Sequence, residues 1–129
     1  MLVQNLNDRR RAVLLHYADE VMRADGRIHP AELVVMDVLR NQIEPGVKAD
    51  HVAIEALPGV FKRRLARVSL MLELVGMGYA NEDFDPKQSE LLNRIAKVFG
   101  FQENGTIDTI EQWGQDQLAL MKQAKLMGS

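Results

Sequence analysis

The chain has no cysteine, which excludes disulfide bonds, thiolate catalysis and cysteine-ligated zinc. Aromatic residues make up only 5%, too few for the stacking platforms that bind single-stranded nucleic acid. The formal net charge is −2, without the basic excess of a nucleic-acid-binding protein, so we expect no nucleic-acid partner. No apolar run has the length of a membrane span, and residues 1–20 lack the apolar run of a signal peptide. We therefore expect a cytoplasmic protein.

What the chain does contain is an ordinary globular balance, with 47% hydrophobic and 26% charged residues among 129. This length predicts one domain, residues 1–129. Apolar residues recur at helical spacing and no segment alternates with the period of a strand. The sequence predicts a compact all-α bundle of about six to seven helices, with the main ones at about 8–23, 30–43, 49–56, 60–79, 86–99 and 103–125.

The bundle is organised around residues 24–32, which read ADGRIHPAE. Gly26 supplies a residue that adopts positive φ without steric cost. Pro30 suits the first position of a helix, where a missing N–H is harmless. Glu32 then stands at the third helical position, from which a carboxylate reaches back to free backbone donors. The stretch therefore predicts a tight turn that leads directly into a helix.

A weaker copy of this turn lies at residues 80–88, ANEDFDPKQ, at an offset of 80 − 24 = 56 residues. The alanine, the proline and the apolar pair Ile28 and Phe84 align. Asp85 is a suitable N-cap and Pro86 a suitable first helical residue. The chain is therefore predicted to hold two helix–turn–helix units related by a pseudo-two-fold axis, with residues 11–43 superposing on 67–99.

Acidic residues in both turns suggest a cation site. Asp25 and Glu32 match the second half of an EF-hand loop, but the first half lacks its oxygen ligands, so an EF-hand is rejected. If the repeats pack about a two-fold axis, one shared site for calcium or magnesium follows, with oxygens from Asp25, Glu32, Glu82 and Asp83. The alternative is that these acids only cap the helix starts and favour the macrodipole.

The three histidines, His16, His29 and His51, are scattered, and no two of them have the i,i+4 spacing of a helical zinc site. His16 has Asp19 and Glu20 one turn on, where either carboxylate can pair with it. No phosphate-binding loop or nucleophile-elbow motif is present. We therefore expect no enzyme, and a hydrolase that uses His16 or His29 is a distant alternative.

Two basic clusters lie early in long predicted helices, where the macrodipole disfavours positive charge. This placement suggests an anionic partner or lipid headgroups. The alternative is a solvated face whose long side-chain stems cover apolar surface. The clusters are Arg9, Arg10 and Arg11, and Lys62, Arg63, Arg64 and Arg67.

The ADGRIHPAE turn and its downstream copy, followed by IAKVFGF at 95–101, resemble the tellurite-resistance TerB-like family over roughly residues 11–113. A related domain occurs in a membrane-anchored J-domain co-chaperone. The resemblance implies an all-α fold with a two-fold repeat, an acidic metal-binding face and a role in bacterial stress response, often near the membrane. Asp25 and Glu32 carry over directly, whereas Asn81 and Gln88 depart from the acidic pattern.

Two functions are therefore expected from the sequence. The first is a non-enzymatic stress-response module, similar to tellurite-resistance proteins, with an acidic, cation-binding face. The alternative is a metal-free adaptor that binds protein partners and lies at the inner-membrane surface through its basic clusters.

Overall fold

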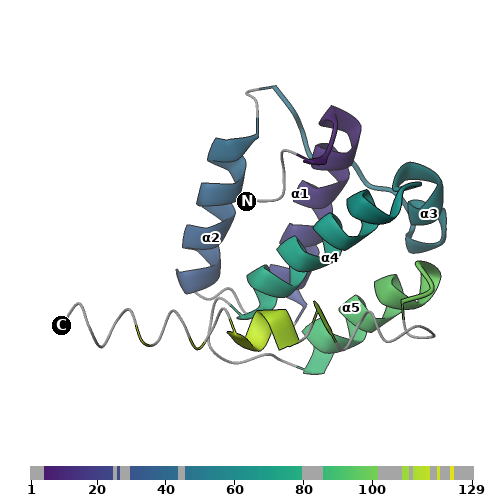
Figure 1. The fold of residues 1–129 in the computed structure, drawn as a ribbon. Helices are drawn as coiled ribbons and strands as arrows, with labels where there is room; N and C mark the ends of the chain where they lie inside the picture. Colours follow the sequence, from purple (N-terminus) through teal and green to yellow (C-terminus); the bar gives the residue numbers. More distant parts are fainter. Residues whose placement is uncertain are drawn as a thin grey trace.

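The computed structural model describes residues 5–24, 26, 30–43, 46–79, 86–101, 109–110, 112–116, 119 and 123. Within these residues every regular element is a helix, which confirms the all-α prediction (Figure 1). The elements in chain order are α1 (Asp8–Arg23), α2 (Pro30–Gln42), the 3-10 turn η2 (Ile54–Ala56), α3 (Leu57–Val60), α4 (Arg64–Tyr79) and α5 (Pro86–Val98).

Helix α1 begins and ends at local signals in the sequence. The side chain of Asn7 accepts a hydrogen bond of 3.0 Å from the backbone N–H of Arg10, which satisfies one of the free donors of the first turn. Asp8 in the first turn and Arg23 in the last both complement the macrodipole. Gly26 follows with φ +79°, and its N–H donates to the carbonyl of Arg23 at 2.9 Å. The turn after α1 therefore uses glycine as predicted.

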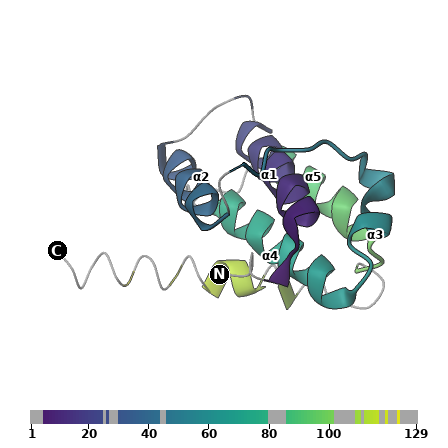
Figure 2. The same cartoon turned by 90° about the horizontal axis from the view of Figure 1, so that it is seen from above.

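Helices α1 and α4 pass through the centre of the molecule and pack against each other (Figures 1 and 2). Helix α2 contacts both of them, and so does α5. The side chains that fill this centre are completely buried, among them Val13, Leu14, Leu70, Leu74 and Ile95. Each outer helix therefore shares one core with the whole bundle.

The prediction of a helix at 49–56 is wrong. Residues 47–53 run extended along α1, and regular structure resumes only at η2. The N–H of Asp50 donates to the carbonyl of Ala12 at 3.1 Å, and the hydroxyl of Tyr17 donates to the carbonyl of Val52. Because α1 supplies partners for these backbone groups, the segment needs no helix of its own.

Residues 57–59, which lie between two of the predicted helices, form most of α3 (Leu57–Val60). Pro58 lies in the first turn of α3, where its missing N–H breaks no helical hydrogen bond. The chain turns at Phe61, with φ −103° and ψ 76°, so the helix expected from 60 begins at Arg64.

Helix α5 begins at Pro86, as predicted, and ends just before Gly100. Gly100 has φ +77°; its N–H bonds to the carbonyl of Lys97, and the N–H of Phe101 bonds to that of Ala96, both at 3.0 Å. This is the left-handed helix ending that favours glycine. The helix expected at 103–125 lies largely outside the described residues, of which 109–110 and 112–116 are helical. The predicted N-cap Asp85 also lies outside them.

Candidate functional site

The starts of α2 and α5 meet inside the protein through Glu32 and Gln88, the third residue of each helix. The side-chain amide of Gln88 donates to Glu32 Oε2 at 2.9 Å and to the carbonyl of Val21 at 2.9 Å. Glu32 is 0% exposed and Gln88 is 2% exposed. One amide therefore ties α5 to both α1 and α2 in an environment without bulk water, where such bonds are strong.

Of the four predicted cation ligands, the structure describes only Glu32. Asp25, Glu82 and Asp83 lie outside the described residues. The two helix starts that the acids adjoin in sequence are brought together, whereas the shared cation site itself stays a prediction.

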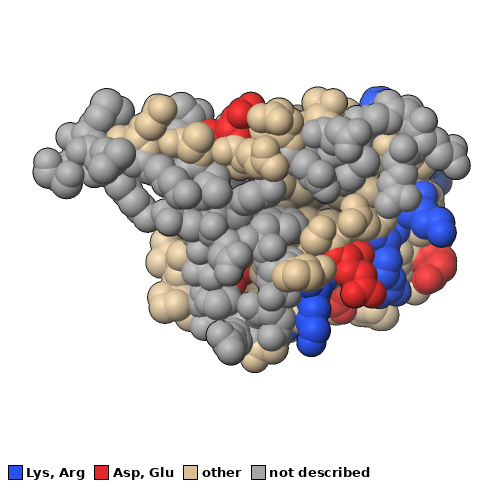
Figure 3. Space-filling view, turned by 90° about the horizontal axis from the view of Figure 1, so that it is seen from below, with Lys and Arg blue, Asp and Glu red and all other residues tan. Residues whose placement is uncertain are grey.

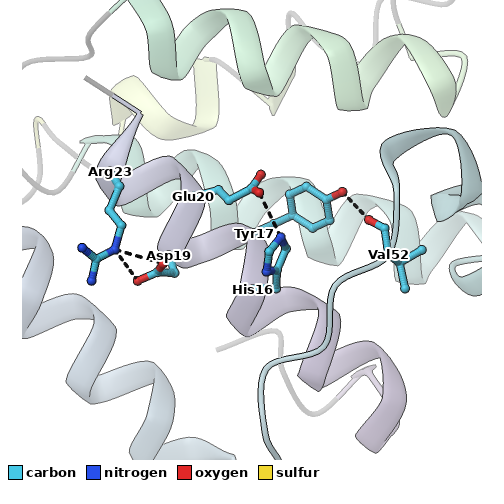
Figure 4. Close-up of polar contacts among 6 residues, drawn as sticks. All are labelled: His16, Tyr17, Asp19, Glu20, Arg23 and Val52. Carbon is cyan, nitrogen blue, oxygen red and sulfur yellow. Dashed lines mark hydrogen bonds and ion pairs between the residues drawn. The ribbon is translucent and has the colours of Figure 1, made fainter. Parts of the chain in front are cut away.

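A second polar cluster joins α1 to the extended segment 47–53. His16 Nε2 lies 2.9 Å from Glu20 Oε1, one helical turn away (Figure 4). The imidazole ring of His51 lies against that of His16, with centroids 4.7 Å apart and planes at 69°. The three side chains offer ligand atoms that all lie within 4.8 Å of one another.

The pairing of His16 with Glu20 was visible in the sequence, but the approach of His51 was not. The two histidines are separated by 35 positions, and residue 51 was assigned to a helix. Only the extended course of residues 47–53 along α1 brings the two rings together.

Tyr17 fixes that course. It is buried, and its hydroxyl points at the carbonyl of Val52 (Figure 4). Burial, together with the negative charges of Glu20 and Glu55, raises the pKa of its phenol to about 12. Tyr17 therefore remains a neutral hydrogen-bond donor at physiological pH.

A groove of about 660 Å³ opens beside His16, between α1, α2 and the segment that follows α2. It carries charges of both signs, from Asp19, Arg40 and Lys48. The groove makes one side of His16 accessible from outside the protein.

The basic clusters are largely used within the fold. Arg10 Nε donates to the carbonyl of Val60 at 2.8 Å, and Arg67 donates to the carbonyls of Pro58 and Phe61. The guanidinium groups of Arg64 and Arg67 lie over the rings of Phe101 and Phe99, at 5.5 Å and 5.3 Å from the ring centroids. These arginines therefore have partners within the fold, whereas an external anionic partner of the clusters stays a prediction.

The remaining surface is mixed in character. Acidic and basic side chains lie next to each other on the face seen from below (Figure 3). Helix α2 also exposes apolar side chains, with Leu33 at 46%, Val34 at 62% and Val38 at 43%. In the described part of the chain, no helix combines the length and apolar character that crossing a membrane requires.

No family model, no curated protein and no solved structure matches this chain. The resemblance to the TerB-like family therefore depends on the two turn sequences and on IAKVFGF at 95–101 alone.

Proposed function

We propose that the chain is a non-enzymatic helical module that binds a hard divalent cation where α2 and α5 begin. Its role would be the bacterial stress response that the TerB-like resemblance implies. The observation that carries the proposal is the buried 2.9 Å hydrogen bond between Glu32 and Gln88, at equivalent places in the two turn sequences. It supports a shared site because it joins the starts of the two helices that follow the acidic turns.

The helix bounds support the internal repeat on which a shared site depends. Helices α1 and α4 both have 16 residues and begin at 8 and 64, a difference of 64 − 8 = 56. Helices α2 and α5 both have 13 residues and begin at 30 and 86, again a difference of 56. Glu32 and Gln88 are separated by the same 56 positions, so a pseudo-two-fold axis would pass between them.

The charges near the two helix starts favour a cation. Each helix N-terminus contributes roughly half a positive charge. Four carboxylates stand in or just before the first turns of α2 and α5, namely those of Asp25, Glu32, Glu82 and Asp83. They exceed the positive charge of the two helix ends, and calcium and magnesium prefer such oxygen ligands.

A thermal melt of chelator-treated protein with and without millimolar calcium or magnesium tests the proposal. A ligand that binds only the native state raises the melting midpoint by mass action, so we expect an upward shift. Asp25→Asn should remove most of the shift. Asp37→Asn, which makes the same change at an exposed position on α2, should respond as the wild type does. If neither ion moves the wild-type midpoint, the acids only cap helices.

A metal-free adaptor is the second candidate, favoured by the exposed apolar face of α2 that Leu33, Val34 and Val38 form. This function predicts that neither calcium nor magnesium changes the melting midpoint. It also predicts that Val34→Glu leaves stability unchanged and removes binding to a protein partner.

Association with a membrane surface would depend on the exposed Lys62 and Arg63, and sedimentation with anionic vesicles measures it.

A further inference from the structure

The cluster of His16, Glu20 and His51 has the composition of a transition-metal site. Two imidazoles and one carboxylate converge, and their ligand atoms lie within 4.8 Å of one another. Imidazole nitrogen suits zinc and its neighbours in the first transition row, whereas calcium and magnesium take oxygen ligands. Zinc centres with three protein ligands of this kind keep a fourth position for water.

The protein holds the backbone of all three residues in place before any ion binds. His16 and Glu20 are one turn apart on α1, between fully buried positions such as Leu14 and Val21. His51 lies between two residues that α1 fixes, since Asp50 N–H bonds to Ala12 and Val52 accepts from Tyr17. Because the residues on both sides of His51 are hydrogen-bonded to α1, the His51 ring can move only a limited distance away from His16.

The geometry needs only a small adjustment to close around an ion. Zinc binds nitrogen and oxygen ligands at about 2.0–2.2 Å, which places tetrahedral ligand atoms about 3.3 Å apart. His16 Nε2 and Glu20 Oε1, at 2.9 Å, would separate slightly. His51 is exposed, so its side chain is free to rotate inward.

We propose that His16, Glu20 and His51 form a site for a divalent transition metal of the zinc class, with water as the remaining ligand. This site is separate from the proposed calcium or magnesium site in its residues, in its position along the chain and in the metals it prefers. A bound ion would join α1 to residues 47–53 and stabilise the fold.

Calorimetric titration of chelator-treated protein with zinc chloride tests this directly. We expect one ion per chain with a dissociation constant in the micromolar range or below. Loss of an outer partner of a metal ligand already costs about 10–100-fold in affinity, so loss of a ligand should cost at least about tenfold. His51→Ala and Glu20→Gln are therefore each expected to weaken binding by at least that factor, with helicity checked by circular dichroism.

Asp19→Asn is the matched control. It removes one negative charge beside Glu20, but the Asp19 carboxylate pairs with Arg23 at 3.0 Å and lies apart from His16 and Glu20 (Figure 4). We expect it to bind zinc as the wild type does. Cobalt supplies a second readout, because Co²⁺ in a four-coordinate site absorbs visible light much more strongly than hydrated Co²⁺, and His51→Ala should weaken that absorption.

The proposal is overturned if the wild type shows no saturable zinc binding, or if His51→Ala and Glu20→Gln bind like the wild type. It stands independently of the calcium or magnesium site, because Asp25→Asn should retain full zinc affinity. His51→Ala should likewise retain any shift of the midpoint caused by magnesium.

Discussion

At the scale of single residues, the hydroxyl of Tyr17 holds the extended segment 47–53 against α1 through the carbonyl of Val52. Tyr17→Phe keeps the ring and removes only this donor. We expect the free energy of unfolding to fall by about 1 kcal/mol, the usual net contribution of one hydrogen bond. Urea denaturation measures the change. An unchanged midpoint would mean that water replaces the hydroxyl without loss.

Arg67 has partners within the fold that the residue pattern does not show. A positive charge early in a helix suggests an external anionic partner, because the macrodipole disfavours it there. In the structure the Arg67 guanidinium binds the carbonyls of Pro58 and Phe61 and lies over the ring of Phe99. Two of these partners, Pro58 and Phe61, precede α4, and the third, Phe99, follows α5. The sequence alone did not show that these residues lie beside Arg67.

At the scale of helices, Glu32 and Gln88 couple the start of α2 to the start of α5. A double-mutant cycle with Glu32→Ala and Gln88→Ala should give a coupling energy between about 0.5 and 3 kcal/mol, the range for residues in direct contact. Denaturation of the four proteins measures it. Purely additive losses would show that the bond does not join the two helices energetically.

The helices that the sequence predicted well are those with their own start and stop signals. Asn7, Pro30 and Pro86 mark the beginnings of α1, α2 and α5, and Gly100 follows the end of α5. These signals act over one or two turns, so they can be read without the fold.

The segment before α3 was not predicted, because its conformation depends on distant partners. Residues 50 and 52 bond to α1 at residues 12 and 17, respectively. The sequence analysis predicted a helix there, and contacts between residues far apart in the sequence hold the segment in another conformation. The same contacts create the approach of His51 to His16, so the error about the segment and the missed cluster have one cause.

At the scale of the whole molecule, the predicted repeat has a direct test, because α1 and α4 are equal in length, α2 and α5 are equal in length, and both pairs begin 56 positions apart. The test is a superposition of residues 11–43 on 67–99. The repeat would be contradicted if α1 and α2 cannot be overlaid on α4 and α5 with each residue shifted by 56.

The crossing of α1 and α4 at the centre has a consequence for how the molecule opens. Helix α2 packs on α4 as well as on α1, and α5 packs on α1 as well as on α4, so neither half has a core of its own. Separation of the halves would expose both sides of the same apolar surface at once. Native-state hydrogen exchange should therefore give the same opening free energy for the central amides of α1 and α4, equal to that of global unfolding. A clearly lower value in one helix would reveal two units that open separately.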